Sequence, residues 1–269
     1  MKKIAIHSVP RSGSSWVGQI FNSSPDVNFK FQPLFSYAFK NYLDIDSSKE
    51  KINEFFEKIA KSNDPFLLQQ DKIDKSIYPV FKKNERYTHI AYKEVRYHHI
   101  LKNLLMVDPD IVVVGIVRNP YAVINSFLNA PREFRKDLGW NELEEWRYAQ
   151  KKNLDRVEEF NGYEKWKELT FLFQKLKREY PDRFYLVKYD ELLTNTIKEV
   201  KNIFNFCDIK LKDQTISFLQ QSTKQNQEDV YSVYKNKKVD NDWEKSLNLQ
   251  IVNEITIDLK KSGLEEYIK

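Results

Sequence analysis

Residues 111–117 read Ile-Val-Val-Val-Gly-Ile-Val, an unbroken apolar run that is the clearest secondary-structure signal in the chain. Such a run without alternation is typical of a strand buried on both faces, as in a parallel sheet covered by helices. Arg118 follows directly, and Pro120 stands where a helix can begin without a backbone N–H group. The stretch therefore predicts a central strand, a short loop and a helix.

On both sides of this stretch, shorter strands alternate with helices. Strands are predicted at Lys2–His7, Val27–Phe31, His89–Val95 and Phe184–Lys188. Helices are predicted at Ser14–Asn22, His98–Met106, Trp140–Glu159, Tyr163–Tyr180, Thr194–Asn205 and Leu249–Ser262. This alternation implies βαβ units and a mostly parallel central sheet flanked by helices, an α/β fold. We expect one domain over residues 1–269, with helical excursions at about 44–83 and 131–180.

The composition excludes several classes of protein. The 44 Lys and Arg residues nearly balance the 39 Asp and Glu residues, so the net charge of +5 favours a locally basic site over a surface that coats nucleic acid. Cys207 is the only cysteine, which rules out an internal disulfide and argues against a structural zinc site. The apolar run after Met1 is too short for a signal peptide or a membrane span, so we expect a cytoplasmic protein.

The loop after the first strand has the composition of a phosphate-binding loop. It reads Pro10-Arg11-Ser12-Gly13-Ser14-Ser15-Trp16 and leads into a predicted helix. Gly13 allows a close approach of the backbone, and the serine hydroxyls and N–H groups stand at the positive end of the helix dipole. A lone Ser-Gly-Ser would also fit an ordinary capped helix. The flanking arginine, which can grip an oxyanion with two donors, favours phosphate.

A second junction of the same kind follows the central strand. Arg118 stands at the carboxyl end of that strand, where ligands bind in open α/β sheets, and Ser126 lies two helical turns further on. One cation and one hydroxyl suit a second phosphate group, although Arg118 alone would equally fit a structural ion pair. The first loop lacks the second glycine and the Lys-Ser/Thr pair of a Walker A motif, which disfavours a Walker-type kinase.

Together these motifs resemble those of the sulfotransferases that use 3′-phosphoadenosine 5′-phosphosulfate (PAPS). Residues 10–16 resemble the 5′-phosphosulfate loop of the carbohydrate-modifying branch, and residues 118–126 resemble the 3′-phosphate motif. Residues 188–193, Lys-Tyr-Asp-Glu-Leu-Leu, resemble a segment near the adenine. Residues 235–238 resemble the basic loop over the 3′-phosphate, although the usual Arg-Lys-Gly is missing. The resemblance implies a three-layer, P-loop-NTPase-like fold.

The resemblance also implies roles for individual residues. Donor binding falls to Arg11, Ser12, Gly13, Ser14, Ser15, Trp16, Arg118, Ser126, Tyr189, Thr223 (or Ser222), Lys235, Lys237 and Lys238. Trp16 matches an aromatic residue that stacks on adenine, although its spacing also fits a core position. Arg11 and Lys93 would neutralise charge on the transferring sulfuryl group, so that no metal is required.

The general base is where the sequence departs from the family. Related enzymes place a glutamate before proline in the segment after the first helix, and this chain has Gln32-Pro33. Another branch places a histidine where this chain has Val95. The base would then be Glu94, His98 or His99, or the acceptor needs little help, as an amine would, with Gln32 orienting it. Glu94 adjoins Lys93, although neighbouring strand residues face opposite sides.

Two other classes of function remain open. A small-molecule kinase would need a Mg²⁺-binding Asp at the end of the central strand, where this chain has Arg118-Asn119. A binding module, or a catalytically inactive nucleotide-binding relative, would lack chemistry altogether. We expect a PAPS-dependent sulfotransferase that acts on a hydroxyl or amine of a glycan or small metabolite, without nucleic acid as partner.

Overall fold

The computed structural model describes residues 1–224, 233 and 239–268. In this part of the chain, five parallel strands form one sheet in the order β2-β3-β1-β4-β5. The strands are β1 (Lys2–His7), β2 (Val27–Phe31), β3 (His89–Glu94), β4 (Ile111–Val117) and β5 (Phe184–Lys188). The expected α/β fold with a parallel central sheet is confirmed.

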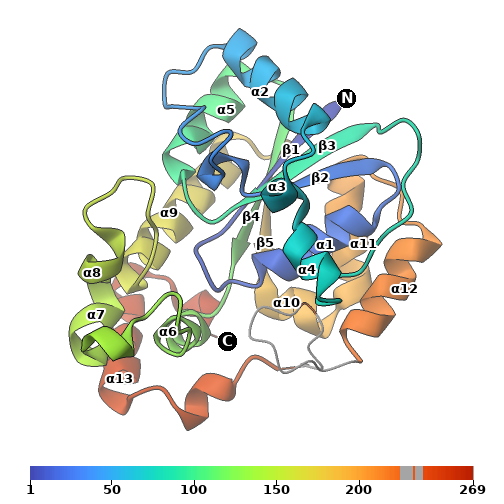
Figure 1. The fold of residues 1–269 in the computed structure, drawn as a ribbon. Coiled ribbons are helices and arrows are strands. Elements are labelled where there is room, and N and C mark those ends of the chain that lie inside the picture. The colour runs from blue at the N-terminus through green and yellow to red at the C-terminus, as the bar shows by residue number, and fades with distance from the viewer. Residues whose placement is uncertain (225–232, 234–238, 269) are drawn as a thin grey trace.

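The sheet is the middle of three layers (Figure 1). One face packs against α2 (Lys49–Lys61), α5 (Leu101–Val107), α6 (Pro120–Leu128), α9 (Tyr163–Glu179) and α13 (Leu249–Ser262). The other face packs against α1 (Ser14–Ser23), α11 (Thr196–Phe206) and α12 (Asp213–Ser222). Both faces of β4 are thereby covered, which is why its sequence is apolar without alternation.

Gly115 interrupts the branched residues of β4 for a packing reason. A Cβ atom there would lie 2.7 Å from Phe184 Cζ and 2.8 Å from Phe173 Cδ2, so only glycine lets these two rings pack onto the strand. The ring centroids of Phe173 and Phe184 are 5.3 Å apart, and both side chains are fully buried. The glycine therefore helps to anchor α9 against the sheet.

Several sequence-based boundaries differ from the structure. The Asp44–Lys83 excursion contains α2 and two short helices, α3 (Pro65–Leu68) and α4 (Gln70–Asp74). The helix expected at Trp140–Glu159 consists of α7 (Glu142–Tyr148) and α8 (Gln150–Asn153), because Ala149 between them is left-handed with φ 48°. The helix expected at Thr194–Asn205 is preceded by α10 (Tyr189–Thr194), and α12 had no clear sequence signal.

The remaining elements are single turns of 3₁₀ helix. They are η1 (Pro33–Phe35), η2 (His98–Ile100), η3 (Lys136–Leu138), η4 (Asp242–Lys245) and η5 (Glu265–Tyr267). The expected helix at His98–Met106 is thus η2 continued by α5. Within the described residues, no helix is both long and apolar enough to cross a lipid bilayer.

The order of the strands decides where a ligand can bind. β1 lies between β3 on one side and β4 on the other, so the chain changes direction across the sheet at β1. The carboxyl ends of β1, β3 and β4 meet at this switch point, which is where open α/β sheets form their binding crevices.

Candidate active site

A cleft of about 550 Å³ opens at the switch point. Its walls come from the loop after β1, the end of β3, one side of α6 and part of α10. The predicted site residues that line it are Arg11, Gly13, Ser14, Ser15, Trp16, Gln32, Lys93, Arg118, Ser126, Tyr189 and Thr223. One cleft therefore collects residues from both halves of the chain.

The loop after β1 is shaped by two left-handed residues, Arg11 with φ 70° and Gly13 with φ 78°. Helix α1 begins directly at Ser14, and its backbone hydrogen bonds start with the N–H groups of Trp16 and Val17, which both donate to the Gly13 carbonyl. The N–H groups of Ser14 and Ser15, two residues that line the cleft, precede these bonds at the positive end of the helix. A Cβ atom on Gly13 would lie 2.2 Å from Tyr189 Cε2, so the glycine is needed both for its backbone angle and for space. This geometry suits an anion at the start of α1.

Ser12 belongs to the same loop but does not line the cleft. Its side chain is fully buried, and among the described residues its hydroxyl has no hydrogen-bond partner. A buried hydroxyl without a partner costs free energy, which is unusual in a native structure outside functional sites. The hydroxyl is an orphaned polar group immediately beside the predicted anion site.

The Arg11 side chain connects the two predicted phosphate sites. Its Nε donates a hydrogen bond of 3.0 Å to the Ser126 hydroxyl in α6. The sequence suggested that Arg11 serves the first loop and Ser126 the second. In the structure these two side chains are hydrogen-bonded to each other, so they lie together between the two loops.

Arg118 is the most fully engaged cation in the cleft. Its Nε and one terminal nitrogen grip the two carboxylate oxygens of Asp240 at 2.5 and 2.6 Å. Its other terminal nitrogen donates to the Arg11 carbonyl at 2.6 Å, and its guanidinium carbon lies 5.1 Å from the centre of the Tyr189 ring. Both side chains of the ion pair are almost completely buried. Sequence reasoning missed Asp240, although it lies close to the basic segment at 235–238.

An aromatic wall closes one side of the cleft. The Trp16 indole N–H donates to the Ser222 hydroxyl at 3.0 Å, and the rings of Trp16 and Tyr189 meet edge to face at 6.2 Å. The Thr223 hydroxyl donates to the Leu219 carbonyl within its own helical turn. Burial raises the pKa of Tyr189 to about 12, so its hydroxyl keeps its proton.

Lys93 lies near the end of β3 with only 3% of its surface exposed. Its Nζ stands 4.5 Å from the centre of the Phe31 ring, on the neighbouring strand. Burial lowers the pKa of Lys93 because it disfavours the charged ammonium form. The lysine therefore stands in the cleft in a weakly solvated position, where an anion would favour its charged form.

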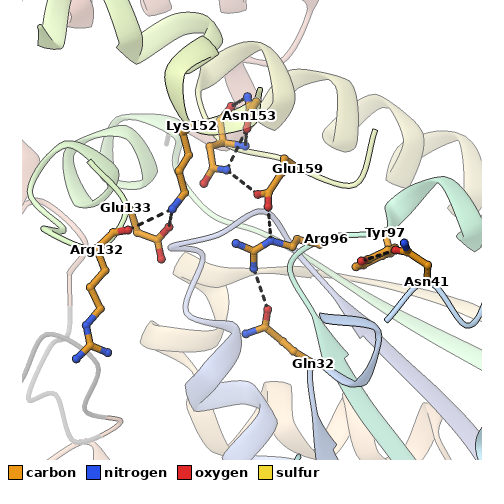
Figure 2. Close-up of polar contacts among 10 residues, drawn as sticks. Gln32, Asn41, Arg96, Tyr97, Arg132, Glu133, Lys152, Asn153 and Glu159 are labelled. Carbon is orange, nitrogen blue, oxygen red and sulfur yellow. Dashed lines mark hydrogen bonds and ion pairs between the residues drawn. The ribbon is translucent and has the colours of Figure 1, made fainter. Parts of the chain in front are cut away.

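Gln32 lines the cleft next to Lys93 and is held in an unusual backbone conformation, with φ 41°. Its N–H donates to the Lys93 carbonyl at 2.8 Å, which ties it to β3. Its side-chain oxygen accepts a 3.2 Å hydrogen bond from Arg96, and Arg96 Nε is paired with Glu159 at 2.9 Å (Figure 2). Arg96 lines the cleft as well and was not among the residues expected from the sequence.

The three residues suggested as the general base do not line the cleft. Glu94 is fully buried on the other side of β3, where Oε1 accepts from the Leu34 N–H at 2.8 Å and burial raises the pKa of the carboxyl group. His98 is fully buried beside Phe160, with its Nδ1 3.0 Å from that of His7. His99 packs near Tyr97 outside the cleft. The structure does not support assigning the base to any of the three.

Two other expectations concern residues or groups that the structure does not place. Lys235, Lys237 and Lys238 lie outside the described residues. Among the described residues, no group of three or more His, Cys, Asp or Glu side chains is arranged to hold a metal ion.

A carboxylate that the sequence did not single out does line the cleft. Glu133, in the loop after α6, forms a 3.0 Å ion pair with Lys152 of α8 (Figure 2). Lys152 also donates to the Arg132 carbonyl at 3.2 Å. No motif marks Glu133, because its position depends on how the loop packs against α8.

Comparisons with known proteins agree with this geometry. The family described as "Sulfotransferase family" matches residues 3–213 of the chain. Mouse sulfotransferase SULT7A1, solved with adenosine 3′,5′-bisphosphate (PAP), has a similar structure with a TM-score of 0.54 at 14% identity, over 99% of this chain and 89% of that one. Retinol dehydratase, solved with androsterone and PAP, has a TM-score of 0.52 at 15% identity, over 96% of this chain and 80% of that one.

At these identities the structural likeness shows a common fold. Among curated proteins, none matches the sequence of this chain.

Proposed function

Because the chain belongs to the sulfotransferase family, we propose that it transfers the sulfuryl group of PAPS to a hydroxyl or amine of a glycan or small metabolite. The observation that carries the proposal is the cleft that is lined by both predicted phosphate loops and by the buried Lys93. Two anion sites on either side of a lysine match a donor that has a phosphate at one end and a phosphosulfate at the other.

The start of α1 would hold the phosphosulfate end of the donor. Gly13 is left-handed, and Ser14 and Ser15 line the cleft at the start of α1, so their N–H groups and hydroxyls would bind this end of the donor. These donors are fixed before the ligand arrives, so binding costs little reorganisation. The orphaned Ser12 hydroxyl lies in the same loop and would gain from a small shift of the backbone toward a bound anion.

Arg118, Ser126 and Arg11 would hold the 3′-phosphate. Arg118 carries its fork of donors at the end of β4, and Arg11 and Ser126 already meet beside it. Trp16 and Tyr189 would border the base, since both rings line the same end of the cleft. In the structure the Asp240 carboxylate is bound to the guanidinium group of Arg118, so donor binding would require this carboxylate to move aside.

Sulfuryl transfer passes through a loose, in-line transition state that is stabilised mainly by position and positive charge. The donor supplies the sulfuryl group. Lys93 would stabilise the negative charge that develops on the oxygen between sulfur and phosphorus, because its ammonium group is poorly solvated and already faces the cleft. Gln32 and Arg96 would position the acceptor.

The hollow beyond Phe31 supports an acceptor with a ring and polar groups. Its volume is about 430 Å³, and Phe31 lines both it and the main cleft. Its other lining residues are Pro65, Phe66, Gln69, Asp71, Lys72 and Arg132. Aromatic faces with hydrogen-bonding groups at the rim suit a sugar or a small cyclic metabolite.

Mass spectrometry of reaction products tests the proposal. The purified protein is incubated with PAPS and a panel that includes N-acetylglucosamine, glucosamine and p-nitrophenol, and the mixture is searched for products heavier by one sulfuryl group. The Lys93→Ala variant is the matched control for contaminating activity. A sulfated product from the wild type alone supports the proposal.

Two outcomes would contradict it. A phosphorylated product formed from ATP and Mg²⁺ would indicate a kinase. Tight binding of PAP with no transfer to any acceptor or to water would indicate a catalytically inactive nucleotide-binding relative.

A further inference from the structure

The proposed reaction needs a group that takes the acceptor's proton, and Gln32 cannot do so. Three carboxylates line the cleft among the described residues: Glu133, Asp240 and Asp242. Asp240 is bound to Arg118 at the end assigned to the nucleotide, and Asp242 begins η4. Glu133 differs from both because it stands within electrostatic reach of Lys93, Arg96 and Arg11.

The loop that carries Glu133 is fixed at both its backbone and its side chain. The Glu133 N–H donates to the Ala130 carbonyl at 2.8 Å, in the turn that ends α6. The carboxylate is held by Lys152 at 3.0 Å, and the same ammonium group binds the Arg132 carbonyl. The side chains of Glu133 and Lys152 keep about a fifth of their surface exposed, so the carboxylate is anchored and still open to the cleft.

Helix α8, which supplies Lys152, lies between two residues with strained backbone conformations. The residues that flank it, Ala149 and Leu154, have φ angles of 48° and 49°, and neither is a glycine. Left-handed conformations of such residues cost free energy and persist only where the surroundings enforce them. Asn153 enforces this one by donating from its side chain to the carbonyls of Tyr148 and Asn161, both at 2.9 Å.

The same short helix is also connected to Arg96 and Gln32 (Figure 2). Asn161 is bound to Asn153 and donates to Glu159 at 3.2 Å, and Glu159 holds Arg96, which in turn holds Gln32. Adjacent residues of α8 thus fix parts of the acceptor end, Lys152 through Glu133 and Asn153 through Arg96. Backbone strain in a helix that holds several residues of one cleft indicates a functional arrangement.

The charges around Glu133 keep it ionised. Burial by itself would raise the pKa of Glu133, but Lys152, Arg96 and Arg11 together lower it below its ordinary value. At neutral pH the group is therefore a carboxylate, which is the form that can accept a proton. Lys152, Arg96, Arg11 and Lys93 are the charged groups that face it.

We propose that Glu133 is the general base of the transfer reaction and that Lys152 is its positioning residue. This inference rests on the proposed function. As the acceptor oxygen forms its bond to sulfur, its proton passes to the Glu133 carboxylate. The bond between sulfur and the bridging oxygen breaks, and its electron pair leaves with PAP. The base thus comes from the loop after α6 instead of the segment after α1.

The decisive variant is Glu133→Gln, which keeps the size of the side chain and removes its basicity. The probe reactions are sulfation of N-acetylglucosamine, sulfation of p-nitrophenol and, with water as acceptor, release of sulfate from PAPS. Loss of a general base should slow transfer to the sugar or to water by about 10²–10³-fold. Transfer to p-nitrophenol should fall far less, because this phenol is already partly ionised at neutral pH.

Two controls separate catalysis from folding and from donor binding. Glu133→Gln should still unfold cooperatively and bind PAP with unchanged affinity, and Glu142→Gln, which breaks an exposed pair with Lys136, should behave as the wild type. Failure of the wild type in every probe reaction would refute the proposed function itself. An equal loss with sugar and with p-nitrophenol, or no loss at all, would overturn only the role of Glu133.

Lys152→Met tests the positioning role independently. Removal of this cation raises the pKa of Glu133, so the acidic limb of kcat/KM against pH should move to higher pH, while turnover above that limb stays within a few-fold of the wild type. Glu133→Asp should retain part of the activity and the same limb. An acidic limb that does not move in Lys152→Met would contradict the assignment.

Discussion

Replacing Asp240 by asparagine should increase the affinity of the protein for PAP. In the structure the Asp240 carboxylate occupies the fork of Arg118 with two hydrogen bonds of 2.5 and 2.6 Å, and both side chains are nearly buried. The fork is the group that we assign to the 3′-phosphate. Donor binding must therefore exchange one buried anion for another.

The size of the effect follows from this exchange. Hydrogen bonds to charged groups contribute about 1.5–3 kcal/mol each. The asparagine amide keeps one oxygen acceptor and loses the charge, so the substitution weakens the competing contact by about the value of one such bond. If the phosphate recovers that difference, PAP should bind about 10- to 100-fold more tightly. The ligand-free variant should unfold at a lower temperature, because Arg118 is left buried with a weaker partner.

Isothermal calorimetry with PAP measures the affinity, and AMP serves as the ligand that lacks the 3′-phosphate. Asp240→Asn should strengthen binding of PAP and leave that of AMP nearly unchanged. Asp137→Asn is the matched control, because Asp137 forms a similar two-bond pair with Arg135 on the surface, away from the cleft. Unchanged or weaker binding of PAP would refute the reasoning and would mean that Asp240 holds Arg118 ready for the phosphate.

Three further predictions concern Lys93 and Gln32. Lys93→Ala should lower turnover by about 10²–10³-fold with little change in PAP affinity, as expected for a cation that acts on the transition state. Steady-state kinetics and calorimetry measure the two quantities, and a loss of PAP affinity without a loss of turnover would contradict this role. Because burial lowers the pKa of Lys93, the side chain of the free protein is neutral at pH values between the lowered pKa and the ordinary pKa of lysine. At these pH values, binding of PAPS should be coupled to uptake of a proton by Lys93, and the affinity for PAPS should fall as the pH rises. Calorimetry in two buffers of different ionisation enthalpy detects the uptake, and equal apparent enthalpies would rule it out. Gln32→Glu should fold normally and keep or raise the rate of transfer to a hydroxyl acceptor, because the new carboxylate would pair with Arg96. A lower thermal midpoint together with lost activity would show that the cleft does not accept a carboxylate at this position.

The sequence by itself determined the features that depend on near neighbours along the chain. The apolar run at 111–117 required a strand buried on both faces, and the structure places it inside a parallel sheet. The loops at 10–16 and 118–126 follow β1 and β4, so the topology of a parallel sheet brings them to one edge. Local residue order therefore sufficed for the fold class and for the position of the two predicted phosphate loops.

Only the tertiary structure decided which groups line the cleft. Adjacent residues of a strand point to opposite faces, so Lys93 opens into the cleft while Glu94 is buried against Leu34. Glu133 lines the cleft and is paired with Lys152 of α8, a helix that lies between two left-handed residues. No local pattern of non-glycine residues predicts such a conformation. The partners of Arg96 and Arg118 stand 63 and 122 residues away along the chain, at separations where sequence periodicity carries no information.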